Sequence, residues 1–264
     1  MRVQGKVVVV TGAGSGMGRQ LVLELVSRGA KVAAVDMREE TLEETKTLAR
    51  GEVASFVLNI TDADGVAALP AEIEAALGPV DALINNAGII QPFVKINDLS
   101  MADAHRVMDV NFTGPLMLIK AFLPGLLARP EAHILNVSSM GAYAPVPGQS
   151  IYGASKAAIK LMTEGLRSEL LGTNVGVTIV FPGAINTNIA KNSGLDMPGG
   201  ADAESSKFKT TEAPVAAKAM VDAIEKNSPR LCIGSDAKLM DRLSRLNPVF
   251  AAGLIAKQMG SLLK

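Results

Sequence analysis

Apolar residues follow two different spacings along the chain. Short runs rich in Val, Ile and Leu alternate with longer segments in which apolar positions recur every three or four residues. The runs are typical of parallel strands buried on both faces, and the longer segments are typical of amphipathic helices. The predicted strands are 7–10, 31–35, 53–59, 81–84, 133–137, 175–181 and 230–233, and the clearest predicted helices are 64–77, 102–127 and 214–226. Strands alternating with helices predict the α/β class, as a doubly wound domain with a seven-stranded parallel sheet and helices on both faces.

Composition agrees with a single domain and narrows the range of partners. The chain has 264 residues, of which 48% are hydrophobic, and this is enough for one large core. Lys plus Arg and Asp plus Glu both number 26, so no excess charge favours nucleic acid or an anionic membrane. Cys232 is the single cysteine, which excludes an intrachain disulfide.

Signals for export, membrane insertion and metal binding are weak. The apolar run 7–10 is too short for a signal peptide, and no uninterrupted apolar stretch reaches the length of a bilayer span. His105 and His133 have no second His or Cys at ligand spacing. We therefore expect a cytoplasmic protein without a protein-bound metal.

A glycine-rich turn follows the first predicted strand. The segment TGAGSGMG at 11–18 places Gly12, Gly16 and Gly18 between this strand and a predicted helix. Glycine permits positive φ and close backbone approach, and a helix N-terminus favours a pyrophosphate. Asp36 closes the next strand, where a carboxylate can accept hydrogen bonds from the ribose hydroxyls of adenosine. This arrangement predicts a dinucleotide site, and the alternative is a tight turn in a flavodoxin-like domain without ligand.

A second group of residues carries candidate acid/base chemistry. Tyr152 and Lys156 lie one helical turn apart in SIYGASKAA, and Ser139 lies upstream in ILNVSSM. Residues i and i+4 share a helix face, so we expect the Lys156 ammonium near the Tyr152 hydroxyl. A positive charge about 4 Å away contributes about 4 kcal/mol at an effective dielectric near 20, which would bring a Tyr pKa of about 10 near 7. Such a Tyr can accept a proton from an alcohol, although Tyr-x-x-x-Lys also occurs by chance in helices.

Six motifs in this order resemble the short-chain dehydrogenase/reductase family over residues 5–235. They are the TGxxxGxG pattern of the turn at 11–18, NNAG at 85–88, Asn111 in VMDVNFTG, Ser139, the pair Tyr152 and Lys156, and Pro182-Gly183 with Thr187. The resemblance implies a Rossmann-type fold and an NAD(P)-dependent oxidoreductase that transfers a hydride between an alcohol and a ketone.

The resemblance also implies a role for individual residues. Tyr152 would be the acid/base, and Ser139 would bind the reacting oxygen. Lys156 would lower the pKa of Tyr152 and hold the nicotinamide ribose. Asn111 would kink its helix and anchor a water that leads to Lys156, and the alternative is a buried amide beside an irregularity near 114–115. The expected catalytic residues are Asn111, Ser139, Tyr152 and Lys156, and the expected cofactor-binding residues are Gly12, Ser15, Gly16, Met17, Gly18, Asp36, Asn59, Ile60, Asn86, Ala87, Gly88, Tyr152, Lys156, Pro182, Gly183, Ile185 and Thr187.

The cofactor is expected to be NAD rather than NADP. Asp36 would meet the 2′-phosphate of NADP with like charge, and Ser15 stands where many NADP-dependent relatives carry a basic residue. Arg38 lies close enough in sequence to weaken this preference. Asn59 stands where many relatives use an Asp to contact the adenine amine, and its amide oxygen is expected to keep that contact.

The expected substrate pocket is mainly apolar. Its predicted walls are Ser139, Tyr152, Gln91, Phe93, Met140, Tyr143, Gln149 and Ala184, with Tyr143 alternatively packed against the loop that follows it. No fixed cation stands among these residues to pair with a carboxylate, which favours a neutral hydrophobic secondary alcohol or ketone. The polar segment 188–210 is predicted to be a mobile lid, in which Lys191, Lys207 and Lys209 are more simply solvated than paired with an acid.

Two other functions stay open on the sequence. The first is a 3-oxoacyl thioester reductase acting on a carrier protein or CoA, although such enzymes usually take NADPH, which Asp36 disfavours. The second is a non-enzymatic NAD sensor or scaffold, against which the complete catalytic set argues.

A C-terminal helical extension, 236–264, follows the dinucleotide-binding and catalytic domain, 1–235. Its apolar residues at helical spacing are Leu239, Leu243, Leu246, Phe250 and Leu254, and Pro248 divides it into two segments. The apolar stripe predicts that the extension covers the substrate cleft, seals a subunit interface or lies on a membrane surface, of which the membrane has the least support. The family resemblance implies a homodimer or homotetramer.

Overall fold

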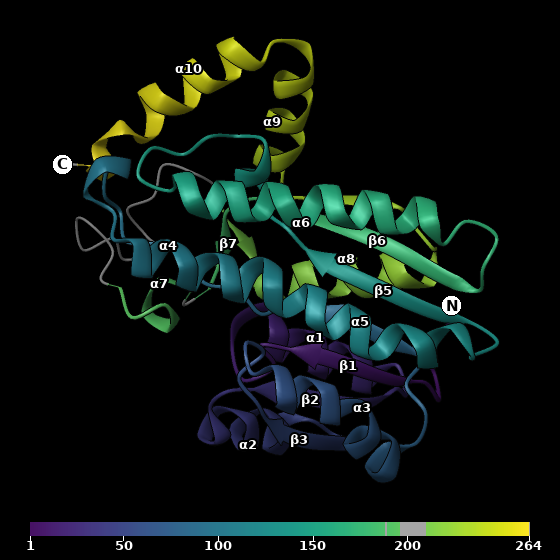
Figure 1. The fold of residues 1–264 in the computed structure, drawn as a ribbon. Helices are drawn as coiled ribbons and strands as arrows, with labels where there is room; N and C mark the ends of the chain where they lie inside the picture. The colour runs from purple at the N-terminus through teal and green to yellow at the C-terminus, as the bar shows by residue number, and fades with distance from the viewer. Residues whose placement is uncertain (188, 196–209, 264) are drawn as a thin grey trace.

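A parallel sheet forms the centre of the computed structural model, which describes residues 1–187, 189–195 and 210–263 (Figure 1). The strand order is β3-β2-β1-β4-β5-β6-β9, and every neighbouring pair is parallel. Its strands are β1 (Val7–Thr11), β2 (Lys31–Asp36), β3 (Val53–Val57), β4 (Ala82–Asn85), β5 (Ala132–Val137), β6 (Val175–Pro182) and β9 (Arg230–Ile233). The predicted α/β class and seven-stranded parallel sheet are thereby confirmed.

Helices cover both faces of this sheet (Figure 1). The helices of the described residues are α1 (Gly16–Ser27), α2 (Glu39–Leu48), α3 (Ala63–Leu77), α4 (Met101–Met108), α5 (Gly114–Leu127), α6 (Ser150–Glu169), α7 (Ile189–Asn192), α8 (Ala213–Glu225), α9 (Ser235–Leu246) and α10 (Pro248–Met259). Short elements join them, namely η1 (Ile96–Asp98), the π-helical η2 (Asp109–Thr113), η3 (Met140–Ala142), β7 (Ile185–Asn186) paired with β8 (Thr211–Glu212), and η5 (Gly260–Leu263). One core contains α1, α2 and α8, and the other contains α3, α5 and α6.

The burial of β1 on both faces explains why residues 7–10 are a continuous apolar run. Val8 and Val10 face the core on the α1 side, whereas Val7 and Val9 face the core on the α3 side. Because both faces of the strand are buried, every position is apolar and no polar alternation appears. The next strand in sequence order, β2, lies on one side of β1, and β4 lies on the other. Such a reversal of strand order opens a crevice at the carboxyl ends of the strands, where ligands bind in folds of this kind.

The helix predicted over 102–127 is interrupted in its middle. The chain runs from α4 through the π-helical η2 into α5, and Asn111 lies in the π-helical segment. The combined helix Met101–Leu127 is long and apolar enough to cross a membrane by length and composition, with a mean hydropathy of 1.4 over its most apolar window. The sequence expectation concerned uninterrupted apolar stretches, and polar residues such as Asn111 and Lys120 interrupt this helix. Leu118, Phe122 and Leu126 of this helix are nevertheless buried against the sheet, as in the core helix of a globular domain.

The C-terminal extension forms α9 and α10, which pack on the loop between β5 and α6. Asn247 caps α10 by accepting a hydrogen bond from the Phe250 N–H at 3.0 Å, so the two helices meet at a defined corner. A small core joins the extension to that loop, and its buried members are Ala144, Met240, Ala251 and Ile255. Polar contacts reinforce this packing, since the Tyr143 hydroxyl donates to the Ala237 carbonyl at 3.0 Å.

Candidate active site

A cleft of about 310 Å³ lies at the carboxyl ends of β1, β2 and β4. Gly12 and Gly16 have φ values of 66° and 51°, which favour glycine, so the turn between β1 and α1 can fold back on itself. A Cβ at Gly18 would collide with the Gly12 carbonyl. The sequence-predicted residues that line the cleft are Gly12, Ser15, Gly16, Met17, Gly18, Asp36, Asn59, Ile60, Asn86, Ala87, Gly88 and Thr187.

The chemistry of the cleft fits a dinucleotide. Ser15 precedes α1 and makes no side-chain cap, and the first turn of α1 has no acidic residue, so its N–H groups and positive dipole end favour a pyrophosphate. Asn86 donates from its side-chain nitrogen to the Thr11 carbonyl at 2.9 Å. Its buried Oδ1 has no hydrogen-bond partner within the residues that the structure describes. A buried acceptor of this kind fits a site in which a ligand supplies the donor.

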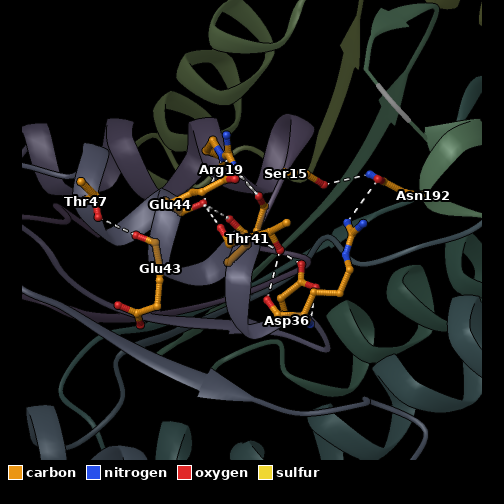
Figure 2. Close-up of polar contacts among 12 residues, drawn as sticks. Ser15, Arg19, Asp36, Thr41, Glu43, Glu44, Thr47 and Asn192 are labelled. Carbon is orange, nitrogen blue, oxygen red and sulfur yellow. Dashed lines mark hydrogen bonds and ion pairs between the residues drawn. The ribbon is translucent and has the colours of Figure 1, made fainter.

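Asp36 lines the cleft at the end of β2, and its carboxylate accepts hydrogen bonds from two backbone N–H groups (Figure 2). One carboxylate oxygen accepts from the Gly14 N–H at 3.0 Å and the other from the Arg38 N–H at 3.2 Å. The Arg38 side chain donates to the Asn192 Oδ1 at 3.2 Å, and the Asn192 side chain donates to the Ser15 hydroxyl at 2.8 Å. Asn192 therefore bridges the two sides of the cleft, as the dashed line from Ser15 in Figure 2 shows.

Several lining residues were not predicted from the sequence. They are Val35, Met37, Arg38, Leu58, Ile89, Val110, Ile189 and Asn192. Most of them flank a predicted residue in the chain, as Met37 and Arg38 follow Asp36, so adjacency would have found them. Ile189 and Asn192 carried no such signal, because they come from the segment that was expected to be a lid.

The candidate acid/base residues meet near this cleft. Helix α6 carries both Tyr152 and Lys156, and the Lys156 Nζ lies 5.9 Å from the centre of the Tyr152 ring. Ser139 follows β5 and starts η3, and its hydroxyl interacts with the Tyr152 phenol. Lys156 is buried and donates to the Val137 carbonyl at 3.1 Å. A Cβ at Gly88 would lie 3.1 Å from the Lys156 Nζ, so the ammonium borders the floor of the cofactor cleft.

The electrostatics of this group differ from the sequence expectation. Burial raises the pKa of Tyr152 above its usual value, and the interaction with Ser139 lowers this pKa by a smaller amount. Burial also lowers the pKa of Lys156 to about 8. The expectation that Lys156 brings the pKa of Tyr152 near 7 is therefore not met by the chain alone, because removing both groups from water disfavours both charges.

Asn111 connects the π-helical segment to the rest of the site. Its Oδ1 accepts from the Ile89 N–H and its Nδ2 donates to the Ile89 carbonyl, both at 2.9 Å. The same nitrogen donates to the Ser155 hydroxyl at 3.0 Å, and that hydroxyl donates to the Tyr152 carbonyl at 2.7 Å. The helix is irregular at Asn111, where it is π-helical, and the Asn111 amide joins Ile89, which follows the NNAG motif, to α6.

A family comparison agrees with this geometry. The family model for short chain dehydrogenases matches residues 6–198. The chain belongs to the short-chain dehydrogenase/reductase family. The chain is 37% identical over 252 residues to SadH of Mycobacterium tuberculosis, a protein named as an oxidoreductase. The match covers 92% of this chain and 91% of SadH. The chain is therefore an oxidoreductase of this family.

Two solved structures are similar in fold and contain a cofactor. A short-chain dehydrogenase/reductase from Burkholderia phymatum in complex with NAD has a TM-score of 0.81 and 28% identity, and the match covers 94% of this chain and 98% of that one. A short-chain dehydrogenase from Burkholderia cenocepacia in complex with NADP also has a TM-score of 0.81 and 28% identity, with 97% and 99% covered. The comparison supports a nicotinamide dinucleotide and leaves the preference between its two forms open.

The family motif after β6 lies partly outside the cleft in this chain. Pro182, Gly183 and Ile185 do not line it, whereas Thr187 does and faces Gly16. The Asp236 carboxylate accepts from the Ala184 N–H at 2.7 Å and leaves no room for a Cβ at Gly183. The first turn of the C-terminal extension thus shapes this loop, and Ala184 is held by Asp236.

Two residues predicted to line the substrate pocket, Gln91 and Gln149, are buried. Gln91 is 0% exposed and Gln149 is 5% exposed, and both point their amides into loop and helix backbone. Both polar ends of the Gln91 amide are bonded to backbone, whereas the Gln149 Oε1 has no partner within the described residues, and a place for either side chain in the substrate wall stays a prediction. Tyr143 packs its ring on Phe181 of β6, with 5.4 Å between ring centres, and donates to Ala237 of α9, so these contacts are with β6 and α9 rather than with the loop that follows Tyr143.

The remaining predicted walls lie under the extension. Met140 packs against the small core that α9 and α10 form with Ala144. A Cβ at Gly148 would meet the Leu263 side chain of η5 and lie 3.5 Å from the Phe93 carbonyl carbon, so the end of the chain returns to the loop before α6. Lys191 lies in α7, whereas Lys207 and Lys209 lie outside the described residues, as does most of the expected lid.

Proposed function

We propose that this chain is an NAD-dependent oxidoreductase that interconverts a hydrophobic secondary alcohol and its ketone, with Tyr152 as the acid/base. The observation that carries the proposal is the meeting of Tyr152, Ser139 and Lys156 beside a cleft whose glycine turn and helix N-terminus fit a dinucleotide. A sensor or scaffold has no need for this arrangement.

Each residue has a distinct part in the proposed reaction. In oxidation, the ionised Tyr152 hydroxyl takes the alcohol proton while Ser139 donates a hydrogen bond to the same oxygen. Lys156 favours the ionised Tyr152 through its charge and lies close enough to the cleft floor to bind the nicotinamide ribose. When bound, the oxidised cofactor supplies the hydride acceptor and a further positive charge. In reduction, the neutral Tyr152 phenol, which burial favours, returns the proton to the carbonyl oxygen.

The cofactor proposal rests on Asp36. Its carboxylate is fixed by two backbone N–H groups at the cleft edge, where it can accept from a ribose hydroxyl and oppose a 2′-phosphate. Arg38 is turned toward Asn192, and the bond between them reduces the freedom of its guanidinium to meet a phosphate.

The substrate proposal rests on the apolar surroundings of Ser139. Met140, which follows Ser139, and Leu263 from the extension contribute apolar side chains to the loop between β5 and α6 that carries Ser139. These side chains favour burial of a hydrocarbon body, and they provide no partner for a carboxylate. We further propose a homo-oligomer in the cytoplasm, as the family resemblance and the weak export signals of the sequence suggest.

A paired screen tests this function. Oxidation of 2-octanol, cyclohexanol, 1-phenylethanol, menthol and a 3-hydroxysteroid is followed by NADH absorbance, beside reduction of an acetoacetyl thioester with NADH and with NADPH. We expect turnover of at least one secondary alcohol with NAD, lost in Tyr152→Phe. Turnover of the thioester alone would favour the 3-oxoacyl reductase, and no turnover with intact NADH binding would contradict the enzymatic proposal.

A further inference from the structure

Gln91 makes a set of hydrogen bonds that the family motifs do not include. The residue follows the NNAG loop by three positions and is 0% exposed. Its Oε1 accepts from the backbone N–H groups of Ile151 at 2.8 Å and Tyr152 at 3.0 Å, and its Nε2 donates to the Gly148 carbonyl at 2.9 Å. A single buried amide therefore binds the start of α6 and the loop before it.

These bonds replace a missing helix cap. The first N–H groups of a helix have no partner inside the helix and need one from elsewhere. Gln149 stands at the N-cap position of α6, but its side chain makes no capping bond. The Gln149 Nε2 instead donates to the Gln91 carbonyl at 2.8 Å, so the loop and the helix start hold each other. Gln91 thus caps α6 from 60 residues away in the sequence.

Both backbone polar groups of Tyr152 are linked by hydrogen bonds to the segment 89–91, which follows the NNAG motif. Its N–H donates to Gln91, and its carbonyl accepts from Ser155, whose hydroxyl accepts from Asn111. Asn111 is bonded in turn to Ile89, which lines the cofactor cleft. The position of the phenol is therefore tied to the wall against which the nicotinamide end of a cofactor would lie.

We propose that Gln91 is a positioning residue for the reaction, which sets the place of Tyr152 relative to Ser139 and the cofactor cleft. This inference rests on the proposed role of Tyr152 as the acid/base. Gln91 touches neither the cleft nor the reacting atoms, and its effect passes through the backbone of Tyr152. Displacements of about 1 Å at a reacting group cost up to about 10²-fold in rate, so the loss of this cap is expected to lower kcat rather than cofactor affinity.

The first test replaces the amide by a chain of similar length. Gln91→Met removes both acceptor bonds to α6, and we expect kcat for the fastest alcohol of the screen to fall by about tenfold or more. The Kd of NADH, from its fluorescence, is expected to stay within about twofold. Hydrogen exchange of the peptide 150–156 is expected to speed up, because its first amides lose their partner.

A matched variant on the same helix separates positioning from stability. Thr163→Val removes the hydroxyl that accepts from the Asn136 Nδ2 at 2.8 Å, deep in α6 and away from Tyr152. We expect it to lower the melting temperature while kcat and the exchange of the peptide 150–156 stay unchanged. Gln91→Glu keeps an acceptor for both N–H groups but places an oxygen against the Gly148 carbonyl, where Gln91 places a donor. It is expected to retain more kcat than Gln91→Met and less than the wild type, and it is compared with the wild type if Gln91→Met does not fold.

The decisive comparison is made in the Tyr152→Phe background. If Gln91 acts through the Tyr152 hydroxyl, Gln91→Met lowers kcat in the wild type but not in Tyr152→Phe. Equal loss in both backgrounds, or an unchanged kcat in the single variant, would overturn the inference. A fully active Tyr152→Phe would instead overturn the proposed function, so the two failures are distinct.

Discussion

The Asp36 carboxylate accepts a hydrogen bond from the Gly14 N–H, with 3.0 Å between the two atoms. This bond joins the end of β2 to the glycine turn, and a Cβ at Gly14 would collide with Thr41 while lying 3.0 Å from the same carboxylate. The close packing leaves Asp36 little freedom to turn away from a ligand. A fixed negative charge at this position is the physical basis for discriminating the two nicotinamide cofactors.

The first prediction concerns this discrimination. We expect kcat/KM to be higher with NAD than with NADP, because contact between like charges costs several kcal/mol. The variant Asp36→Ala should raise the ratio of kcat/KM with NADP to kcat/KM with NAD by about tenfold or more. Glu43→Gln removes a carboxylate from α2 outside the cleft and should leave the ratio unchanged. Equal or better kcat/KM with NADP in the wild type would show that Asp36 does not select the cofactor.

The second prediction concerns the acid/base. Tyr152→Phe should lower turnover by about 10²-fold or more while NADH affinity stays nearly unchanged, since general acid–base catalysis is worth about 10²–10⁴-fold. Lys156→Ala should reduce both turnover and NADH affinity. Stopped-flow turnover and fluorescence titration separate the two quantities. Unaltered NADH binding in Lys156→Ala would remove only the ribose role.

The third prediction follows from the raised pKa of Tyr152. Oxidation needs the ionised hydroxyl, so kcat/KM for the alcohol is expected to rise with pH through the neutral and alkaline range. Reduction needs the neutral phenol, so kcat/KM for the ketone is expected to hold at neutral pH and to fall at high pH. Parallel pH profiles of the two directions test this. Identical profiles would show that another group carries the proton.

Sequence patterns predicted the sheet, and most of the residues predicted to bind the cofactor line one cleft, because both features depend on local signals. Strand runs, glycines that need positive φ and a carboxylate at a strand end all lie within short segments. The pKa of Tyr152 was harder to predict, because it depends on burial, which the spacing of Tyr152 and Lys156 does not reveal. The hydrogen bonds of Gln91 with α6 were hard to predict for a similar reason. Its neighbour in the fold, the start of α6, lies 60 residues away, and no local pattern indicates that pairing.

The fourth prediction concerns His133, which is buried in β5 at the far end of the sheet from the cleft. Its Nε2 lies 2.8 Å from the Thr178 hydroxyl, which itself donates to the Ser228 carbonyl, so the ring is expected to be neutral with its proton on Nε2. Burial lowers the pKa of His133 from 6.5 to about 3. Between pH 6.5 and about pH 3, His133 is therefore protonated in the unfolded chain but not in the folded chain. The free energy of unfolding falls as the pH is lowered through this range.

The measurement is urea unfolding between pH 7.5 and 4.5. The His133 contribution should fall by about 1.4 kcal/mol for each pH unit below 6.5, and His133→Gln should remove this part of the acid loss while keeping a donor for Thr178. His105→Gln is the matched control, since His105 is exposed on α4. Parallel curves for the wild type and His133→Gln would mean that the histidine is not buried as a neutral ring.

The last prediction concerns the C-terminal extension. The sequence predicted that Leu239, Leu243, Phe250 and Leu254 are buried in the functional assembly. Within one chain, Leu243 and Leu254 pack on the small core, whereas Leu239 and Phe250 are 56% and 58% exposed. Their burial would therefore need a second surface. The contacts of Asp236 with the Ala184 N–H and of Asp241 with Arg230 show that α9 supports the domain itself, so the sharper test removes only residues 248–264.

We expect this truncated protein to keep its oligomeric state in light scattering, because the extension packs mainly on the loop beside the catalytic group. Leu263 and the small core lie against the loop between β5 and α6, which is the proposed wall of the substrate pocket. The KM for menthol and the 3-hydroxysteroid should therefore change several-fold more than the KM for cyclohexanol, because only the bulky substrates would extend to this wall. A smaller species would favour the subunit interface, and loss of binding to liposomes would favour the membrane surface. If mass, KM and liposome binding all stay unchanged, the apolar periodicity of this segment reflects packing alone.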